Sequence, residues 1–122
     1  MKKQLMLAAF ATMLSAPATA GDWTKEDTAW QAAYLTLHVV DWGQTRDISA
    51  QPERYYEKNS ILGEHPSRKR VDSYFVGAAI LHTGIAYALP PKWRRLWQCV
   101  AIGSSAGAVA NNVNIGLQVN FK

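Results

Sequence analysis

The chain is poor in cysteine, and small exported domains often depend on disulfides for stability. It contains one cysteine, Cys99, in 122 residues, so no disulfide can form within the chain to compensate for a small core. Cys99 lies in an apolar run, and we expect it to be a small, buried packing residue. Stability must therefore come from packing, from a partner or from a bilayer.

Motifs for catalysis, metal binding and nucleic-acid binding are also missing. No serine lies in a G-x-S-x-G context, and the histidines show neither H-x-x-x-H nor H-E-x-x-H spacing. Basic residues are scattered among acidic ones except in two clusters, 68–70 and 92–95, which we interpret as solvated flanks. The sequence favours a protein that is not an enzyme and has no metal, cofactor or nucleic-acid partner.

The first twenty residues have the pattern of a secretory signal peptide. Lys2 and Lys3 precede an apolar run over residues 5–14, and the small residues Ala18-Thr19-Ala20 follow it. A basic segment, an apolar segment and an A-x-A site are the three parts of such a peptide. We predict cleavage after Ala20, which leaves one small domain, residues 21–122, with 11 basic and 9 acidic side chains.

The rest of the chain predicts an all-α fold, a small three-helix hairpin or bundle. Thr24 to Asp27 has the pattern of a capping box, Ser67 can cap a second helix, and Pro91 suits the first turn of a third. Hydrophobic periodicity and these signals place the helices over about residues 25–48, 67–89 and 91–112.

The C-terminal tail allows three interpretations. Apolar and polar residues alternate strictly over residues 113–121, which is typical of a strand. No second alternating run exists in the chain to pair with it. The tail therefore pairs with another chain, packs on the helices as an extended or irregular segment, or continues the third helix.

Two environments compete for this domain. Residues 71–89 are apolar except for Asp72, Ser73, His82 and Thr83, and tryptophan and tyrosine cluster near the ends of the expected helices, as in an interfacial aromatic belt. Mean hydropathy is only −0.16, which favours a soluble bundle. We expect a membrane-embedded protein of the inner membrane, with a soluble periplasmic bundle as the alternative.

Several short motifs extend this expectation. They are Asp41-Trp42-Gly43-Gln44-Thr45, Glu57-Lys58-Asn59 with Ile61-Leu62-Gly63, Pro66-Ser67, a mid-helix histidine and Asn111-Asn112. Over about residues 37–116 the chain resembles a loose group of uncharacterised small membrane proteins from bacteria and phages, with D-x-x-Q-T and E-x-N-x-x-L-G-x-x-P-S segments. The chain departs from that group at Ser60, where proline is usual. The resemblance implies a membrane location. The group has no known activity that the resemblance could assign to this chain.

Four polar residues form a first candidate cluster. His38, Asp41 and Thr45 share one helix face, and His82 lies midway along the second helix. Polar groups at membrane depth are costly, which makes each a functional candidate. Three interpretations stay open: a hydrogen-bond network that pins the first two helices together, a metal site with Glu57, and an acid–base pair.

Residues Glu57, Asn59 and Gly63 form a second cluster in the connection between the first two helices. Glycine and asparagine there indicate a shaped turn, and the alternative is a polar loop that docks a partner.

Small residues favour close helix packing. Gly77 and Gly84 on the second helix face the G-x-x-x-G pair Gly103 and Gly107 on the third. We expect these stripes to pack within one chain, with a homo-oligomer as the alternative. The sequence thus favours an envelope protein that acts by binding or assembly on a bilayer, a protein partner or another copy; the alternative is a soluble periplasmic binding module for a metal or small ligand.

Overall fold

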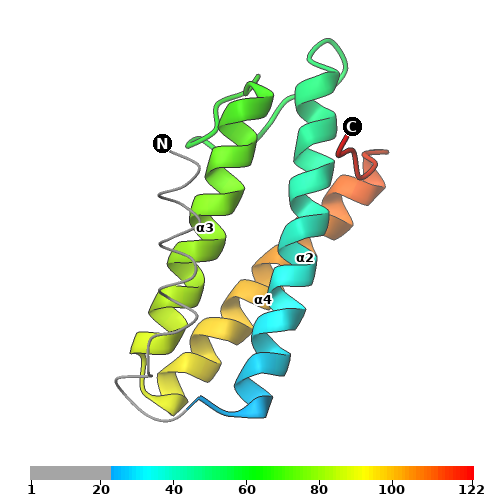
Figure 1. The fold of residues 1–122 in the computed structure, drawn as a ribbon. Helices are drawn as coiled ribbons and strands as arrows, with labels where there is room; N and C mark the ends of the chain where they lie inside the picture. The colour runs from blue at the N-terminus through cyan, green and yellow to red at the C-terminus, as the bar shows by residue number, and fades with distance from the viewer. Residues whose placement is uncertain (1–22) are drawn as a thin grey trace.

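The computed structural model describes residues 23–122, which form three α-helices and no strand (Figure 1). The helices are α2 (Lys25–Ala50), α3 (Arg68–Ala88) and α4 (Pro91–Asn114). The all-α prediction is confirmed for this part of the chain, and each helix ends within two residues of its expected position. The predicted signal peptide lies outside the described residues.

The helices begin where their capping residues predict. The Thr24 hydroxyl accepts a hydrogen bond from the Asp27 backbone N–H, and the Asp27 carboxylate accepts one from the Thr24 N–H, which completes the capping box of α2. The Ser67 hydroxyl caps α3 by accepting from the Arg70 N–H, and Pro91 opens α4.

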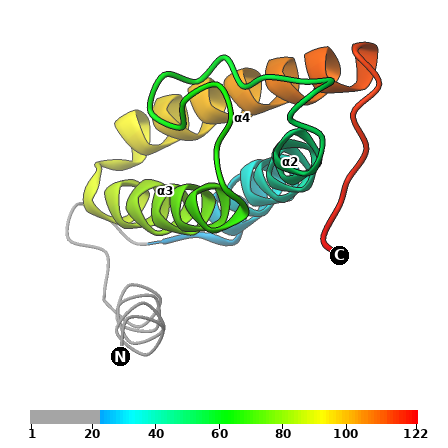
Figure 2. The same ribbon diagram turned by 90° about the horizontal axis from the view of Figure 1, so that it is seen from above.

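The three helices form a wedge in which α3 and α4 are the two sides and α2 packs against both of them. A tight connection at Leu89–Pro90 joins α3 to α4, and the two helices diverge from that end while both pack against α2 (Figures 1 and 2). The connection 51–67 lies over the open end of the wedge (Figure 2). This divergence leaves room between α3 and α4 for a pocket.

The interior of the bundle is unusually polar. Within residues 23–122, eleven polar or charged side chains are buried and only seven hydrophobic ones. The apolar cluster is small: Leu62 from the connection packs with Val71 and Phe75 of α3, and Trp42 and Tyr74 flank it. The other contacts between helices include side-chain hydrogen bonds and ring contacts, such as those of His82 with Tyr34 and Trp97.

The C-terminal tail is an extended segment packed on α2, one of the three interpretations that the alternation left open. After α4 ends, the Gln118 N–H donates to the Asp47 carboxylate and the Asn120 N–H donates to the Gly43 carbonyl. A Cβ atom at Gly43 would collide with the tail side chains Val119 and Phe121. Gly43 therefore allows the tail to approach the helix backbone.

Hydropathy does not support the expected membrane embedding. None of the helices within residues 23–122 combines the length and apolar character that a membrane span requires. Residues 71–89, the best candidate from the sequence, are interrupted by Asp72 and by buried His82 and Thr83.

Two packing predictions are wrong. No atom lies within 4 Å of a Cβ built at Gly77, Gly103 or Gly107, so these three glycines do not bring α3 and α4 together; Gly84 is half-buried on α3. Cys99 is exposed, because the apolar run around it faces outward from α4.

Candidate functional site

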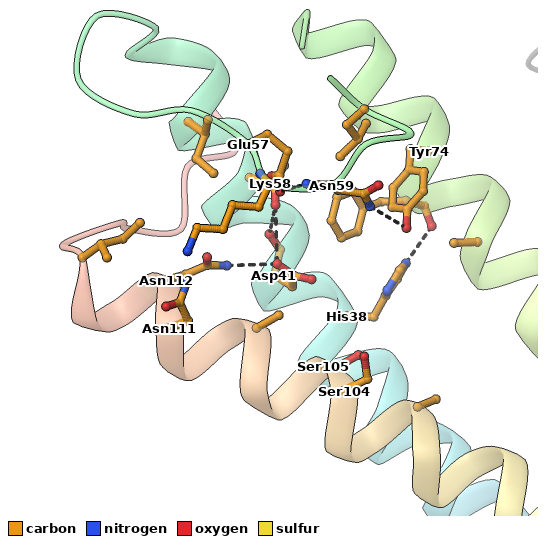
Figure 3. Close-up of a pocket in the computed structure, with 18 of the residues that line it drawn as sticks. His38, Asp41, Glu57, Lys58, Asn59, Tyr74, Ser104, Ser105, Asn111 and Asn112 are labelled. Carbon is orange, nitrogen blue, oxygen red and sulfur yellow. Dashed lines mark hydrogen bonds between the residues drawn. The ribbon is translucent and has the colours of Figure 1, made fainter. Parts of the chain in front are cut away.

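A cavity of about 420 Å³ lies in the wedge between α3 and α4. Its floor is α2, and the connection 51–67 closes one end (Figure 3). Such a volume is in the range of small-molecule sites. The cavity brings together residues of both sequence-predicted clusters, among them His38, Asp41, Thr45, Glu57 and Asn59.

Asp41 is the most perturbed acid in the cavity. Its Oδ1 accepts hydrogen bonds from the Asn112 amide at 3.0 Å and from the Thr45 hydroxyl at 3.4 Å. The pKa of Asp41 is raised to about 6, chiefly by burial and also by the nearby Glu57 carboxylate, while the hydrogen bonds from Asn112 and Thr45 oppose this rise. The carboxyl group therefore changes charge close to neutral pH.

His38 is oriented by both of its ring nitrogens. Its Nε2 lies 2.8 Å from the Phe75 carbonyl oxygen, which can only accept, so Nε2 carries the proton. The Tyr34 hydroxyl then donates to Nδ1 across 3.4 Å. Burial lowers the pKa of His38, which keeps the ring neutral, while the Phe75 hydrogen bond opposes that shift. His38 thus joins α2 to α3 and has no ring nitrogen left for a metal or a serine.

The loop cluster is built as a turn with one carboxylate facing the cavity. Glu57 accepts hydrogen bonds from the backbone N–H groups of Lys58 and Asn59. The Asn59 side chain accepts from the Ile61 N–H and donates to the Tyr74 hydroxyl, which ties the loop to α3. Gly63 has a φ of +83°, a conformation that favours glycine. Asn59 and Gly63 shape the loop, and Glu57 and Lys58 are its charged groups at the cavity.

The two cavity carboxylates lack a cationic partner. Neither Asp41 nor Glu57 forms an ion pair with any residue in 23–122. Lys58 also lines the cavity, and Figure 3 shows its side chain extending toward Asn111 and Asn112. The cavity thus holds two carboxylates and one lysine, Lys58, surrounded by amides, hydroxyls and aromatic rings, and within residues 23–122 neither carboxylate forms an ion pair.

His82 does not belong to this cavity. It packs against α2, as expected, but Gln31 is its partner in place of His38 or Asp41: the Gln31 amide lies 3.0 Å from His82 Nδ1. The ring stacks between Tyr34 and Trp97, and burial lowers its pKa to about 4. The predicted cluster of four therefore divides into a cavity group and a separate network.

That second network centres on Arg94, which sequence reasoning missed. Arg94 is fully buried, pairs with Asp27 at 2.9 Å and donates to the Ala86 carbonyl at 2.7 Å. Gln98, also fully buried, donates to the Asp27 carbonyl and to the Gln31 amide oxygen. The interpretation of 92–95 as a solvated flank is wrong for Arg94, because its charge is compensated from α2.

The sequence contains one pattern that corresponds to this network. Arg94, Gln98 and Asn112 fall at helical spacing on one face of α4, and that face is the buried one. Asn112 connects the network's helix to the cavity, since its amide donates to both Asp41 and Gln44. The pattern was not predicted because the apolar face of α4 was expected to be its buried face.

The described residues offer no metal centre. Within residues 23–122, no three histidine, cysteine, aspartate or glutamate side chains gather closely enough to hold an ion. The metal alternative built on His38, Asp41, Glu57 and His82 fails because His82 lies elsewhere and both His38 nitrogens are engaged.

Comparisons of the chain with family models, curated proteins and solved structures find no match. The resemblance to small membrane proteins of bacteria and phages therefore stays a prediction, and functional argument depends on the site itself.

Proposed function

We propose that this protein is a non-enzymatic binding protein of the cell envelope whose α2–α3–α4 cavity binds a small cationic ligand, such as an amine. One observation carries the proposal: Asp41 and Glu57 face the same cavity without an ion-pair partner in the described chain. The Glu57 carboxylate raises the pKa of Asp41, and a cation bound beside Asp41 would offset that repulsion.

The surroundings of the two carboxylates suit an organic cation. Tyr34, Tyr56 and Tyr74 line the cavity, and aromatic faces attract ammonium groups. Asn111 and Asn112 add amide oxygens that can accept hydrogen bonds from the ligand. An acidic ligand would meet two carboxylates and one lysine, Lys58, and this net negative charge disfavours it.

The same geometry supports binding without catalysis. Ser104 and Ser105 line the cavity, but neither forms a hydrogen bond with a base in the described chain. A serine nucleophile needs a base within hydrogen-bond reach, and the His38 ring is already committed to Tyr34 and Phe75.

The test is a thermal-shift panel of aliphatic amines, diamines and quaternary ammonium compounds, with carboxylic acids of equal size as controls. We expect some amines to raise the melting temperature and the acids to leave it unchanged. Asp41→Asn and Glu57→Gln should each abolish the shift. Glu53→Gln is the matched control, because Glu53 is exposed in the same connection and does not line this cavity. A shift that survives Asp41→Asn would refute the proposed site.

A second proposal concerns the location expected from the sequence, the inner membrane. Eleven large hydrophobic side chains are exposed in residues 23–122 while the interior is polar, which is the reverse of a typical water-soluble bundle. Contact with lipid would cover part of this apolar surface. Alkaline carbonate extraction of cell membranes tests it: retention in the pellet supports lipid contact, and release into the supernatant excludes it.

A further inference from the structure

The outer face of α4 is apolar from Trp93 to Ala110. Trp93, Leu96 and Val100 are 53%, 51% and 63% exposed, and Gly103, Gly107 and Ala110 continue the same face. We call these six residues the α4 stripe. No charged residue occurs from Leu96 to the end of the helix at Asn114. Figure 2 shows α4 at one edge of the bundle, with no other helix on its outer side.

The spacing of the stripe is that of a coiled-coil seam. Its members follow one another at intervals of three, four, three, four and three residues, the a/d repeat of a heptad. The stripe lies opposite the buried face that carries Arg94, Gln98 and Asn112. A seam of this spacing that faces outward suits a helix from outside the described chain.

The order of large and small side chains along the stripe indicates that its partner is α4 of a second copy. Large residues occupy its first half and small residues its second half. If two copies of α4 pair antiparallel about a two-fold axis between residues 101 and 102, Trp93 meets Ala110, Leu96 meets Gly107, and Val100 meets Gly103. Every large side chain then faces a small residue of the other copy, and a symmetric interface requires this self-complementarity.

Charge also favours the antiparallel arrangement. The last turn of α4 carries no basic residue, so its terminal carbonyls and the negative end of the helix dipole are uncompensated by its own side chains. In the antiparallel pair, Lys92 of one copy lies beside Asn111, in the last turn of the other. A parallel pair would instead bring the two Lys92 side chains together.

We propose that the α4 stripe is the interface of an antiparallel homodimer. A bilayer would cover the large apolar side chains, but Gly103 and Gly107 offer it no side chain to bury. A second copy of α4 would instead contact the large and the small residues of the stripe. Contact along about 27 Å of helix, residues 93–110, and about 10 Å of width buries on the order of 500 Å² in total. Stable dimers bury about 1,200 Å² or more, so we expect a reversible dimer that forms at high protein concentration.

Cysteine trapping tests the pairing directly. In a Cys99→Ser background, Leu96→Cys and Gly107→Cys are purified separately, oxidised alone and oxidised as a mixture. In a dimer of either variant alone, the two copies of the introduced cysteine lie about 16 Å apart along the axis of the antiparallel pair. We therefore expect a disulfide dimer only in the mixture. Leu81→Cys mixed with Gly107→Cys is the control, because Leu81 is 62% exposed on α3 and outside the stripe.

Two further variants test the size match by sedimentation equilibrium. Gly107→Leu should weaken dimerisation at least tenfold without lowering the melting temperature, since no atom lies within 4 Å of the added Cβ and leucine favours a helix more than glycine does. Leu96→Ala combined with Gly107→Leu exchanges large for small and should restore the dimer. Self-crosslinking of Leu96→Cys alone, no disulfide in the mixture, or unchanged dimerisation of Gly107→Leu would each overturn the proposal. So would vesicles of phosphatidylcholine that bind the protein and abolish the crosslink.

Discussion

Replacing Asp27 with asparagine tests whether the buried polar network holds the bundle together. Asp27 accepts hydrogen bonds from the Thr24 N–H at 3.0 Å, from Arg94 at 2.9 Å and from Arg95 at 3.1 Å. Burial alone would raise the pKa of Asp27, but the bonds from Thr24, Arg95 and Arg94 together lower it. The carboxylate is therefore stabilised in its charged form.

The expected cost follows from the burial of Arg94. Removing one partner of a buried ion pair costs about 3–5 kcal/mol, because the other charge is left uncompensated. Asparagine keeps a neutral acceptor for Arg94 and Thr24, so we expect the lower end, about 3 kcal/mol. In a domain of this size such a loss lowers the melting temperature by about 12 °C or more.

Urea unfolding followed by tryptophan fluorescence measures this cost. Glu26→Gln is the matched control: it makes the same charge change one residue away, but Glu26 is 71% exposed and its pair with Arg95 should contribute less than about 1 kcal/mol. Adding Arg94→Met to Asp27→Asn removes the buried guanidinium that has lost the Asp27 carboxylate and should recover part of the loss. A cost below about 1 kcal/mol for Asp27→Asn would refute the reasoning.

Three shorter predictions concern the tail, the cavity and the leader. Gly43→Ala should cost about 1–3 kcal/mol and make residues 115–122 sensitive to protease, because the new Cβ displaces the docked tail. The folded pKa of Asp41 is about 6 against an ordinary 3.8, so its stabilising contribution is full below pH 3.8 and is lost as the pH rises through 6. Asp41→Asn should consequently raise the free energy of unfolding at pH 7.5 by at most about 3 kcal/mol and change it little at pH 3.5. Intact-mass measurement of the exported protein should give a chain that begins at Gly21.

Local signals predicted the helices well. The capping box at Thr24, the Ser67 cap and Pro91 act within a few residues of themselves, and each starts a helix as the sequence indicates. These signals depend on backbone hydrogen bonds that local sequence determines. The same local logic left the tail ambiguous, since its docking depends on Gly43, more than seventy residues away.

The interior could not be predicted from hydropathy. Periodicity analysis takes the apolar face of a helix as its inner face, but α4 buries Arg94 and Gln98 and exposes Leu96 and Val100. Arginine is buried only where a carboxylate and carbonyl groups meet it, and those come from other segments. The candidate site was partly predictable for a similar reason: His38, Asp41 and Thr45 share a face of α2, whereas the contribution of α4 through Asn112 depends on how the helices cross.

Calorimetric titration at two pH values tests the central claim most directly. The titrant is the amine that gives the largest thermal shift, and the protein is compared with Asp41→Asn at pH 7.5 and pH 5.0. Because Asp41 has a pKa of about 6, about a tenth of it is ionised at pH 5.0, so we predict that affinity falls about tenfold at the lower pH. Asp41→Asn should bind weakly at both values. Equal affinity of the unmodified protein at pH 7.5 and pH 5.0 would contradict a cation site built on Asp41.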